Sequence, residues 1–234
     1  MLENLFYFIF RILFLAAIVV AWRKIRRPIV AKAHEPFGNP GPGPDQASRF
    51  SGVLVRKDIN LWKIGLKNME ALEDVLVDVL CRLPAEARSA YFHSGYRVIV
   101  VADNLWPQVL QSRGIGLNPA EYGGFSYKER AEVLFKASAF QPKLIAHELG
   151  HVVQYLVGPK GEGPSKVFFQ QHASKIAEIA GWDYPKQSPE ECWAETFALF
   201  ATQRQQLLNA CPKAANLVAF MMITLIEKGY AEAA

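Results

Sequence analysis

The chain has 234 residues, 51% of them apolar, which suits one globular domain with short appendages. Its three cysteines are odd in number and widely spaced, so a disulfide framework is excluded and a reducing compartment is favoured. Residues 1–32 hold six lysines and arginines against one glutamate, a net +5 that leaves −1 on the rest of the chain, so nucleic-acid binding is not expected.

Residues 5–22, LFYFIFRILFLAAIVVAW, predict a membrane-spanning helix. Eighteen helical residues reach about 27 Å, close to the thickness of a bilayer core. Arg11 disfavours insertion by up to about 3 kcal/mol, whereas the twelve Leu, Ile, Val and Phe side chains favour it by about 4 to 7 kcal/mol in total. Insertion therefore dominates, and the Arg11 side chain can extend toward the N-terminal side of the membrane.

A cleaved signal peptide and a helix lying in the membrane interface are the alternatives for this segment. Val19, Val20 and Ala21 would serve as a cleavage site, but the basic run RKIRR at 23–27 follows at once and resists translocation. Apolar residues surround the helix on all sides, which disfavours an interfacial position. We therefore expect a single-pass anchor over residues 1–22, with the chain after it in the cytoplasm.

The segment after the anchor predicts a linker. Residues 28–49 contain five prolines and three glycines, a composition typical of a stiff, unfolded spacer. With the basic run they make an expected juxtamembrane segment and linker over 23–49. We expect the folded domain to occupy residues 50–234.

The first half of this domain predicts both helices and strands. Apolar residues at helical spacing predict a helix over 66–83, ending before Pro84. The apolar run YRVIVV at 96–101 reads as a strand, and a short helix is expected over 104–114. Apolar and polar residues partly alternate at 123–135, which predicts a strand or hairpin entered through two glycines.

The second half predicts helices alone. One helix is expected to begin near Pro142 and to end at Gly158. Further helices are expected at about 165–180, 189–209 and 213–228, the last of which is too short to span a membrane and reads as a buried helix. Because strands come early and helices late, the domain is predicted to belong to the α+β class.

The motif HELGH at 147–151 predicts a metal site. On a helix, His147 and His151 lie one turn apart on the same face, so both imidazoles can bind a single ion. Glu148 projects beside them, where it can contact a metal-bound water and act as a base. Two histidines do not hold a catalytic zinc ion, so a third ligand is required.

A third histidine does not supply that ligand. The extended HExxHxxGxxH pattern would need glycine at 154 and histidine at 157, where the chain has Gln154 and Val157. His172 lies in the middle of a predicted helix, where a packed or solvated side chain is expected. The downstream carboxylates are the better candidates.

Two glutamates on one predicted helix, SPEECWAETFALF at 188–200, are candidates for the third metal ligand. Ser188 is a plausible helix cap, and Glu191 and Glu195 then share one face because they are four residues apart. One carboxylate can bind the metal while the other accepts the outer N–H of a ligand histidine. Glu190 is turned about 100° away and reads as a solvated charge at the start of the helix.

These two motifs together resemble the gluzincin metallopeptidases. HELGH is followed some forty residues later by E-x-x-A-E-x-F-A at 191–198, and YPKQSPEECWA at 184–194 is similar to the Mlc titration factor class. The lethal-factor catalytic domain also has a tyrosine seven residues before its glutamate ligand. The resemblance covers about residues 120–205 and implies a zincin-like fold. It implies one zinc ion with His147, His151 and Glu191 as ligands, Glu148 as general base, Glu195 as a support for a ligand histidine and Tyr184 as oxyanion partner.

The expected function is a membrane-anchored zinc endopeptidase that hydrolyses a protein or peptide substrate. A zinc-activated water would attack the peptide carbonyl, with Glu148 moving the proton and the strand within 123–135 lining the cleft. One alternative keeps this chemistry but directs it at a transcription factor, as an anti-repressor. The other is a zinc-containing module that binds or titrates a protein partner without cleaving it, against which Glu148 argues because a structural metal site needs no base.

Overall fold

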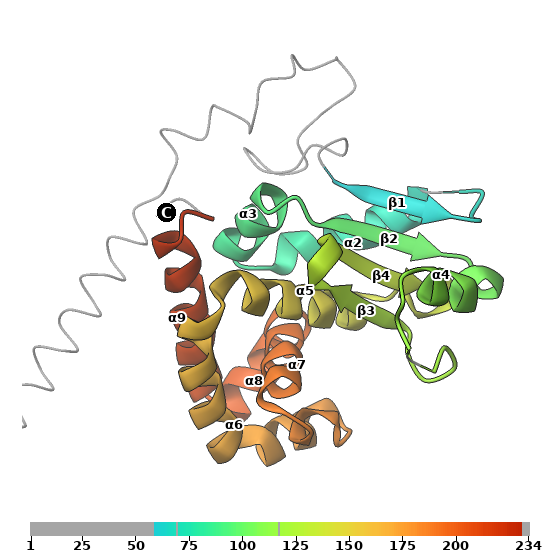
Figure 1. Ribbon diagram of the computed structural model, residues 1–234. Coiled ribbons are helices and arrows are strands. Elements are labelled where there is room, and N and C mark those ends of the chain that lie inside the picture. The colour runs from blue at the N-terminus through green and yellow to red at the C-terminus, as the bar shows by residue number, and fades with distance from the viewer. Residues whose placement is uncertain (1–58, 69, 117, 231–234) are drawn as a thin grey trace, which may run out of the picture. The chain divides into compact units, whose positions relative to one another are not determined.

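A four-stranded mixed sheet occupies the N-terminal half of the described chain (Figure 1). The computed structural model describes residues 59–68, 70–116 and 118–230, which all belong to one unit of the chain, Leu54–Glu232. The strand order is β1-β2-β4-β3, with β1, β2 and β4 parallel and β3 antiparallel to β4. The strands are β1 Leu61–Ile64, β2 Arg97–Val101, β3 Gly124–Tyr127 and β4 Glu132–Lys136.

The two central strands, β2 and β4, are buried on both faces, as the runs of consecutive apolar residues within them require. On one face Ile99, Val101 and Leu134 pack against Trp106 and Leu110 from helix α4, Trp106–Ser112. The alternate residues of both strands point to the opposite face, because successive side chains on a strand alternate. That face carries helix α5, Pro142–Val157, which contacts β3.

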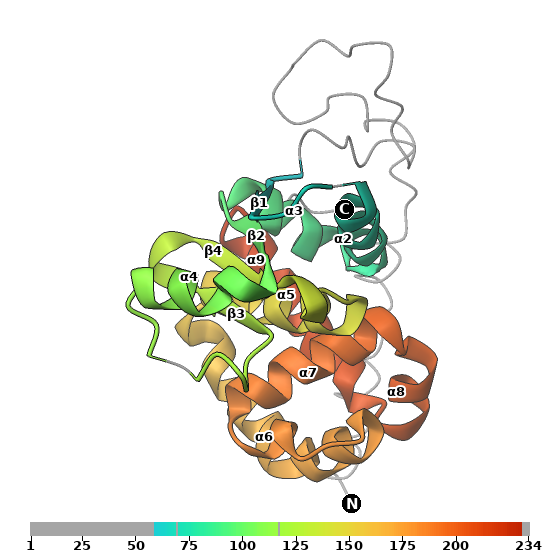
Figure 2. The same cartoon turned by 90° about the vertical axis from the view of Figure 1, so that its right-hand side faces the viewer.

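Helix α5 is the centre of the domain (Figures 1 and 2). It contacts α2 and α3 on the sheet side and α7 and α9 on the helical side, and its middle turns are buried all round. A proline at its first position and Gly158 after its last residue, with φ of 61°, set its two ends. The other helices are α2 Glu70–Arg82, α3 Ala85–His93, α6 Pro159–Ala180, α7 Pro189–Thr202, α8 Arg204–Ala210 and α9 Lys213–Glu227.

Most of the predicted elements are confirmed, and the domain is of the α+β class. The helix expected over 66–83 is α2, the strand over 96–101 is β2, and the hairpin over 123–135 is β3 and β4. The hairpin turns through a short 3-10 segment, Lys128–Arg130, and Ala131 with φ of 49°. β1 and α3 were not predicted, because β1 is short and half-exposed and α3 is only weakly amphipathic.

Two predicted helix boundaries in the second half are wrong. The helix expected from about 165 begins at Pro159 directly after Gly158, since proline at the first helical position loses no hydrogen bond. The helix expected over 189–209 is divided into α7 and α8 at Gln203, whose φ of −138° and ψ of 40° are not helical. The last helix, α9, buries Leu217, Met221 and Leu225, as predicted, but leaves Phe220 and Ile223 exposed.

The predicted anchor, 1–22, and the linker, 23–49, lie outside the described residues. Within the described ranges, no single helix has the length and apolar composition needed to cross a membrane. Helices α8 and α9 meet that test only as a pair, and they are bent by 117° relative to each other.

Candidate metal centre

Helix α5 places the two motif histidines side by side in the interior. His147 and His151 are 5% and 9% exposed, and their rings lie 5.0 Å apart at an angle of 79°. The Nε2 atoms of both rings face one carboxylate oxygen, Oε2 of Glu191, at 3.1 and 3.4 Å. The two imidazoles therefore converge on the first turn of α7.

Close packing of α5 on α7 produces this convergence. Gly150, between the two histidines, faces α7 so closely that an added Cβ would lie 3.0 Å from the Cα atom of Ala194. The indole N–H of Trp193 donates to the Gly150 carbonyl oxygen at 2.7 Å, which fixes the two helices relative to each other. The hydroxyl of Ser188 accepts the backbone N–H of Glu191 at 3.1 Å and so caps α7, as predicted.

The three side chains form a group that could hold a metal ion. One potential ligand atom from each of His147, His151 and Glu191 lies within 4.8 Å of the other two. Glu190, the neighbouring carboxylate, is exposed and is not part of this group. Of the two carboxylates that the sequence left open, the structure brings Glu191 to the Nε2 atoms of the histidines.

Glu195 lies behind the group and is fully buried. Its Oε2 atom is 3.3 Å from Nδ1 of His147, and its Oε1 atom is 2.7 Å from the ammonium nitrogen of Lys143. A carboxylate in this position fixes the orientation of the imidazole and directs Nε2 toward Glu191. The sequence reasoning missed Lys143, although it lies one turn before His147 on the same face of α5.

The charges of the cluster depend on one another. Burial by itself lowers the pKa of His147, but hydrogen bonds with Glu191 and Glu195 and the charge of Glu148 outweigh it and raise the pKa to about 10. Burial likewise opposes ionisation of Glu191, yet hydrogen bonds from His147 and His151 lower its pKa to about 2. In metal-free protein, a proton on His147 therefore supplies a positive charge between two carboxylates.

The side chain of Glu148 lies against the sheet, at strand β3. It is 6% exposed, and the Ser126 hydroxyl lies 2.8 Å from both its backbone oxygen and its Oε2 atom. An added Cβ at Gly124 would lie 3.1 Å from the Glu148 side chain, so β3 can approach this closely because that residue is glycine. The sequence predicted neither contact, since both join segments more than twenty residues apart.

Tyr184 lies at the margin of the group, on the 3-10 turn Tyr184–Lys186. Its ring is 5.9 Å from the ring of His147 and is stacked on Trp182 at 5.0 Å. Burial first, and then the charges of Glu191 and Glu148, raise its pKa. The hydroxyl therefore stays protonated at neutral pH and can act as a hydrogen-bond donor near the carboxylates.

His172 is not part of the group. It is half-buried on α6, and its ring packs 4.9 Å from the ring of Phe168, so of the packed or solvated side chain that the sequence predicted, the structure shows the packed one. Tyr155, which the sequence reasoning did not consider, lies one turn beyond the second motif histidine. Its ring is stacked on that of His151 at 6.3 Å and an angle of 20°.

Comparison with protein-family models and with curated proteins gives no match to this chain. The likeness to gluzincins therefore rests on the motifs at 147–151 and 184–198. The structure itself establishes the α+β fold and a largely buried His-His-Glu group that could hold a metal ion.

Proposed function

We propose that the chain is a zinc-dependent endopeptidase, anchored to a membrane through residues 5–22. One observation carries the proposal: a His-His-Glu group lies beside a buried glutamate that is not a member of the group and is fixed to the edge strand of a sheet. A group that only stabilised the fold would not need Glu148 in this place.

The donor set supports zinc as the metal. Two imidazole nitrogens and one carboxylate are a common set in catalytic zinc sites and leave a coordination position open. Glu195 and Lys143 orient His147, as the outer partners of metal-ligand histidines do. A dication held between the two imidazoles would also offset the negative charge of the Glu191 carboxylate, which lies within 3.4 Å of both Nε2 atoms. When bound, zinc supplies a Lewis acid that polarises a carbonyl and lowers the pKa of a coordinated water toward 7.

Glu148 is the proposed general base and acid. Its carboxylate accepts a proton from the attacking water and returns it to the departing amine. The hydroxyl of Ser126 holds one of its oxygens, which restricts the rotation of the side chain and leaves the other oxygen to handle the proton. Tyr184, a protonated donor whose ring lies 5.9 Å from the ring of His147, is the proposed partner of the developing oxyanion.

Strand β3 is the proposed support for the substrate backbone. In an antiparallel pair only alternate residues bond the partner strand, and the N–H of Lys136 donates to the Gly123 carbonyl oxygen. Gly124 and Ser126 therefore direct their backbone groups to the free edge of β3, where the Tyr155 hydroxyl lies 3.4 Å from the Ser126 carbonyl oxygen. An extended peptide added at this edge would pass beside Glu148.

The membrane anchor and the cytoplasmic position of the domain are part of the proposal and rest on the sequence of 5–27. A C-terminal tag on the full chain should resist protease in intact cells and be digested after lysis. Digestion in intact cells would refute the orientation, and recovery of the whole protein in the soluble fraction would refute the anchor.

Hydrolysis is tested with the purified full-length chain and unfolded casein. Cleavage should require zinc, stop with a chelator and return when zinc is added. Glu148→Gln should keep its zinc and lose cleavage, because an amide in place of the carboxylate does not accept a proton. A zinc-loaded wild-type chain that never cleaves would instead favour the non-catalytic binding module, and full activity of the variant would refute the mechanism.

A further inference from the structure

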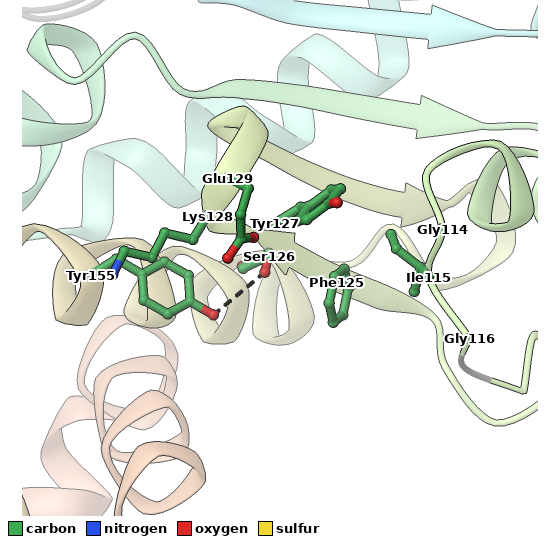
Figure 3. A pocket seen from close by; sticks show the side chains of 9 residues that line it. All are labelled: Gly114, Ile115, Gly116, Phe125, Ser126, Tyr127, Lys128, Glu129 and Tyr155. Atoms are coloured by element: carbon green, nitrogen blue, oxygen red, sulfur yellow. Dashed lines mark hydrogen bonds between the residues drawn. The ribbon is translucent and has the colours of Figure 1, made fainter.

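A hollow of about 420 Å³ opens beside the metal centre, along β3 (Figure 3). Tyr155 from α5 stands on one side of it and Ile115 on the other, with Phe125 of β3 between them. Its volume lies within the range of pockets that take small molecules or single side chains.

Two of the residues that line the hollow also contact the centre. Tyr155 stacks on the ring of His151, and Ser126 holds Glu148 through its hydroxyl. Tyr155 and the strand residue Ser126 thus lie between the hollow and the metal group. The backbone groups of Ser126 lie at the free edge of β3. In a peptide paired with this edge, the side chain adjacent to the bond at the metal centre would therefore enter this hollow.

The lining favours an uncharged, bulky side chain. The walls are formed by the rings of Phe125, Tyr127 and Tyr155 and by the aliphatic side chain of Ile115. The charged residues of the lining are Lys128 and Glu129, which are exposed and of opposite sign. The ammonium of Lys128 lies 5.8 Å from the centre of the Tyr155 ring, where a cation–π contact already engages it. The rim therefore carries no net charge to select an ionic side chain.

We infer that this hollow is a substrate subsite that binds an aromatic or large aliphatic side chain adjacent to the bond at the metal centre. The inference rests on the proposed function for the position of the bond, but the binding of the side chain does not depend on cleavage. Phe125 sets the depth of the subsite, because it lies in the wall between the two sides and its ring is only half-buried.

The test measures binding with a chain that cannot hydrolyse. Zinc-loaded full-length Glu148→Gln protein is titrated against fluorescent decapeptides of alanine, glycine and serine with one varied residue: phenylalanine, leucine, alanine, aspartate or lysine. Phenylalanine and leucine peptides should bind about 10- to 100-fold more tightly than the alanine peptide, as expected for burial of one large apolar side chain. Aspartate and lysine should give no such gain.

Two substitutions of Phe125 on the same background assign the effect to this hollow. Phe125→Trp should fill the space and reduce the preference for phenylalanine over alanine to less than threefold, whereas Phe125→Ala should widen the pocket and reduce the preference for leucine. Phe220→Ala, an exposed phenylalanine on α9, is the matched control and should change neither. Melting temperatures near that of the parent chain establish that the variants are folded.

The outcomes separate this inference from the proposed function. Equal binding of all peptides, no binding of any, a preference for a charged residue, or a phenylalanine preference unchanged by both Phe125 variants would each overturn the subsite. A preference that Phe125→Trp removes, in a chain whose wild type cleaves none of the peptides, would support the subsite and refute the peptidase. Cleavage of the peptides without any preference for a side chain would support the peptidase and refute the subsite.

Discussion

Replacement of Gly150 by alanine should weaken both the fold and the metal site. The new Cβ would lie 3.0 Å from the Ala194 Cα atom and 3.3 Å from both the Ala194 carbonyl oxygen and the Phe197 Cβ atom. Two of these three neighbours are backbone atoms, so α5 and α7 must move apart. Such overpacking costs about 1 to 3 kcal/mol, against which the better helix propensity of alanine returns about 1 kcal/mol. We expect a net loss of about 0 to 2 kcal/mol in the free energy of unfolding.

The same displacement acts on the metal site, because Glu191 is carried by α7 and the histidines by α5. A shift of a few tenths of an ångström between the helices loosens all three ligand distances, and we expect zinc affinity to fall about 10- to 100-fold, as for the loss of an outer partner of a ligand. Urea unfolding of the metal-free chain and competition with a chromogenic chelator measure the two effects separately.

Gly163 provides the matched control on a neighbouring helix. It lies in α6, and an added Cβ there would meet no atom of another helix or strand within 4 Å. Gly163→Ala should therefore leave zinc affinity unchanged and change the free energy of unfolding little, because the better helix propensity of alanine is opposed by the crowding of its Cβ against the ring of Pro164. If Gly150→Ala stabilised the protein, or left zinc affinity as high as Gly163→Ala does, the close packing of α5 on α7 and the explanation of the site that depends on it would both be wrong.

Three further predictions concern the site itself. Glu191→Ala should lower zinc affinity by more than about 100-fold, whereas Glu190→Ala, which removes an exposed carboxylate one position earlier, should leave it nearly unchanged in equilibrium dialysis; a reversed order would refute the ligand set. Tyr184→Phe should lower kcat by about 10- to 1,000-fold at unchanged zinc content, as for the loss of one oxyanion donor; an unchanged kcat with a lower melting temperature would make it a packing residue. Because the pKa of His147 is raised to about 10 in the metal-free chain, zinc must displace its proton at neutral pH, and the apparent affinity should rise about tenfold per pH unit between pH 6 and 8; a flat profile would mean that the imidazole is already neutral.

The same pKa has a consequence for the stability of the metal-free chain. The folded-state pKa of His147, about 10, lies above the ordinary value of 6.5. The stabilisation that its proton provides to the cluster is therefore fully present below pH 6.5 and is lost as the pH rises through 10. A bound metal cation would replace that proton as the positive charge between the carboxylates, so zinc should stabilise the chain most at alkaline pH.

The elements of the site could be predicted from the sequence because helix formation is local. Pro142 and Gly158 mark the ends of α5, and Ser188 caps α7, through signals that act within a few residues. The four-residue spacing of His147 and His151 then places both imidazoles on one face, whatever the rest of the chain does. The pair of histidines on one face of a helix, and the class of the fold, follow from such signals.

The sequence could not decide which carboxylate meets the histidines. Glu191 and Glu195 are one turn apart on the same face of α7, so their spacing along the helix does not distinguish them as ligands. The separation and crossing of α5 and α7, set by the glycine at 150 and the Trp193 hydrogen bond, bring one carboxylate to the Nε2 atoms and the other to Nδ1. Lys143 joins the group for the same reason, through a contact between residues far apart in the chain.

The sheet depended even more on tertiary structure. β1 has four residues, half of them exposed, and becomes a strand because it pairs in parallel with β2, more than thirty residues away. The contact of β3 with Glu148 likewise needs the hairpin to lie against α5, which no local pattern specifies. Hydrogen bonds within a helix join residues four apart, so a short stretch of sequence contains the information that they need. Strand pairing and helix packing join residues tens of positions apart, and these contacts exist only in the folded chain.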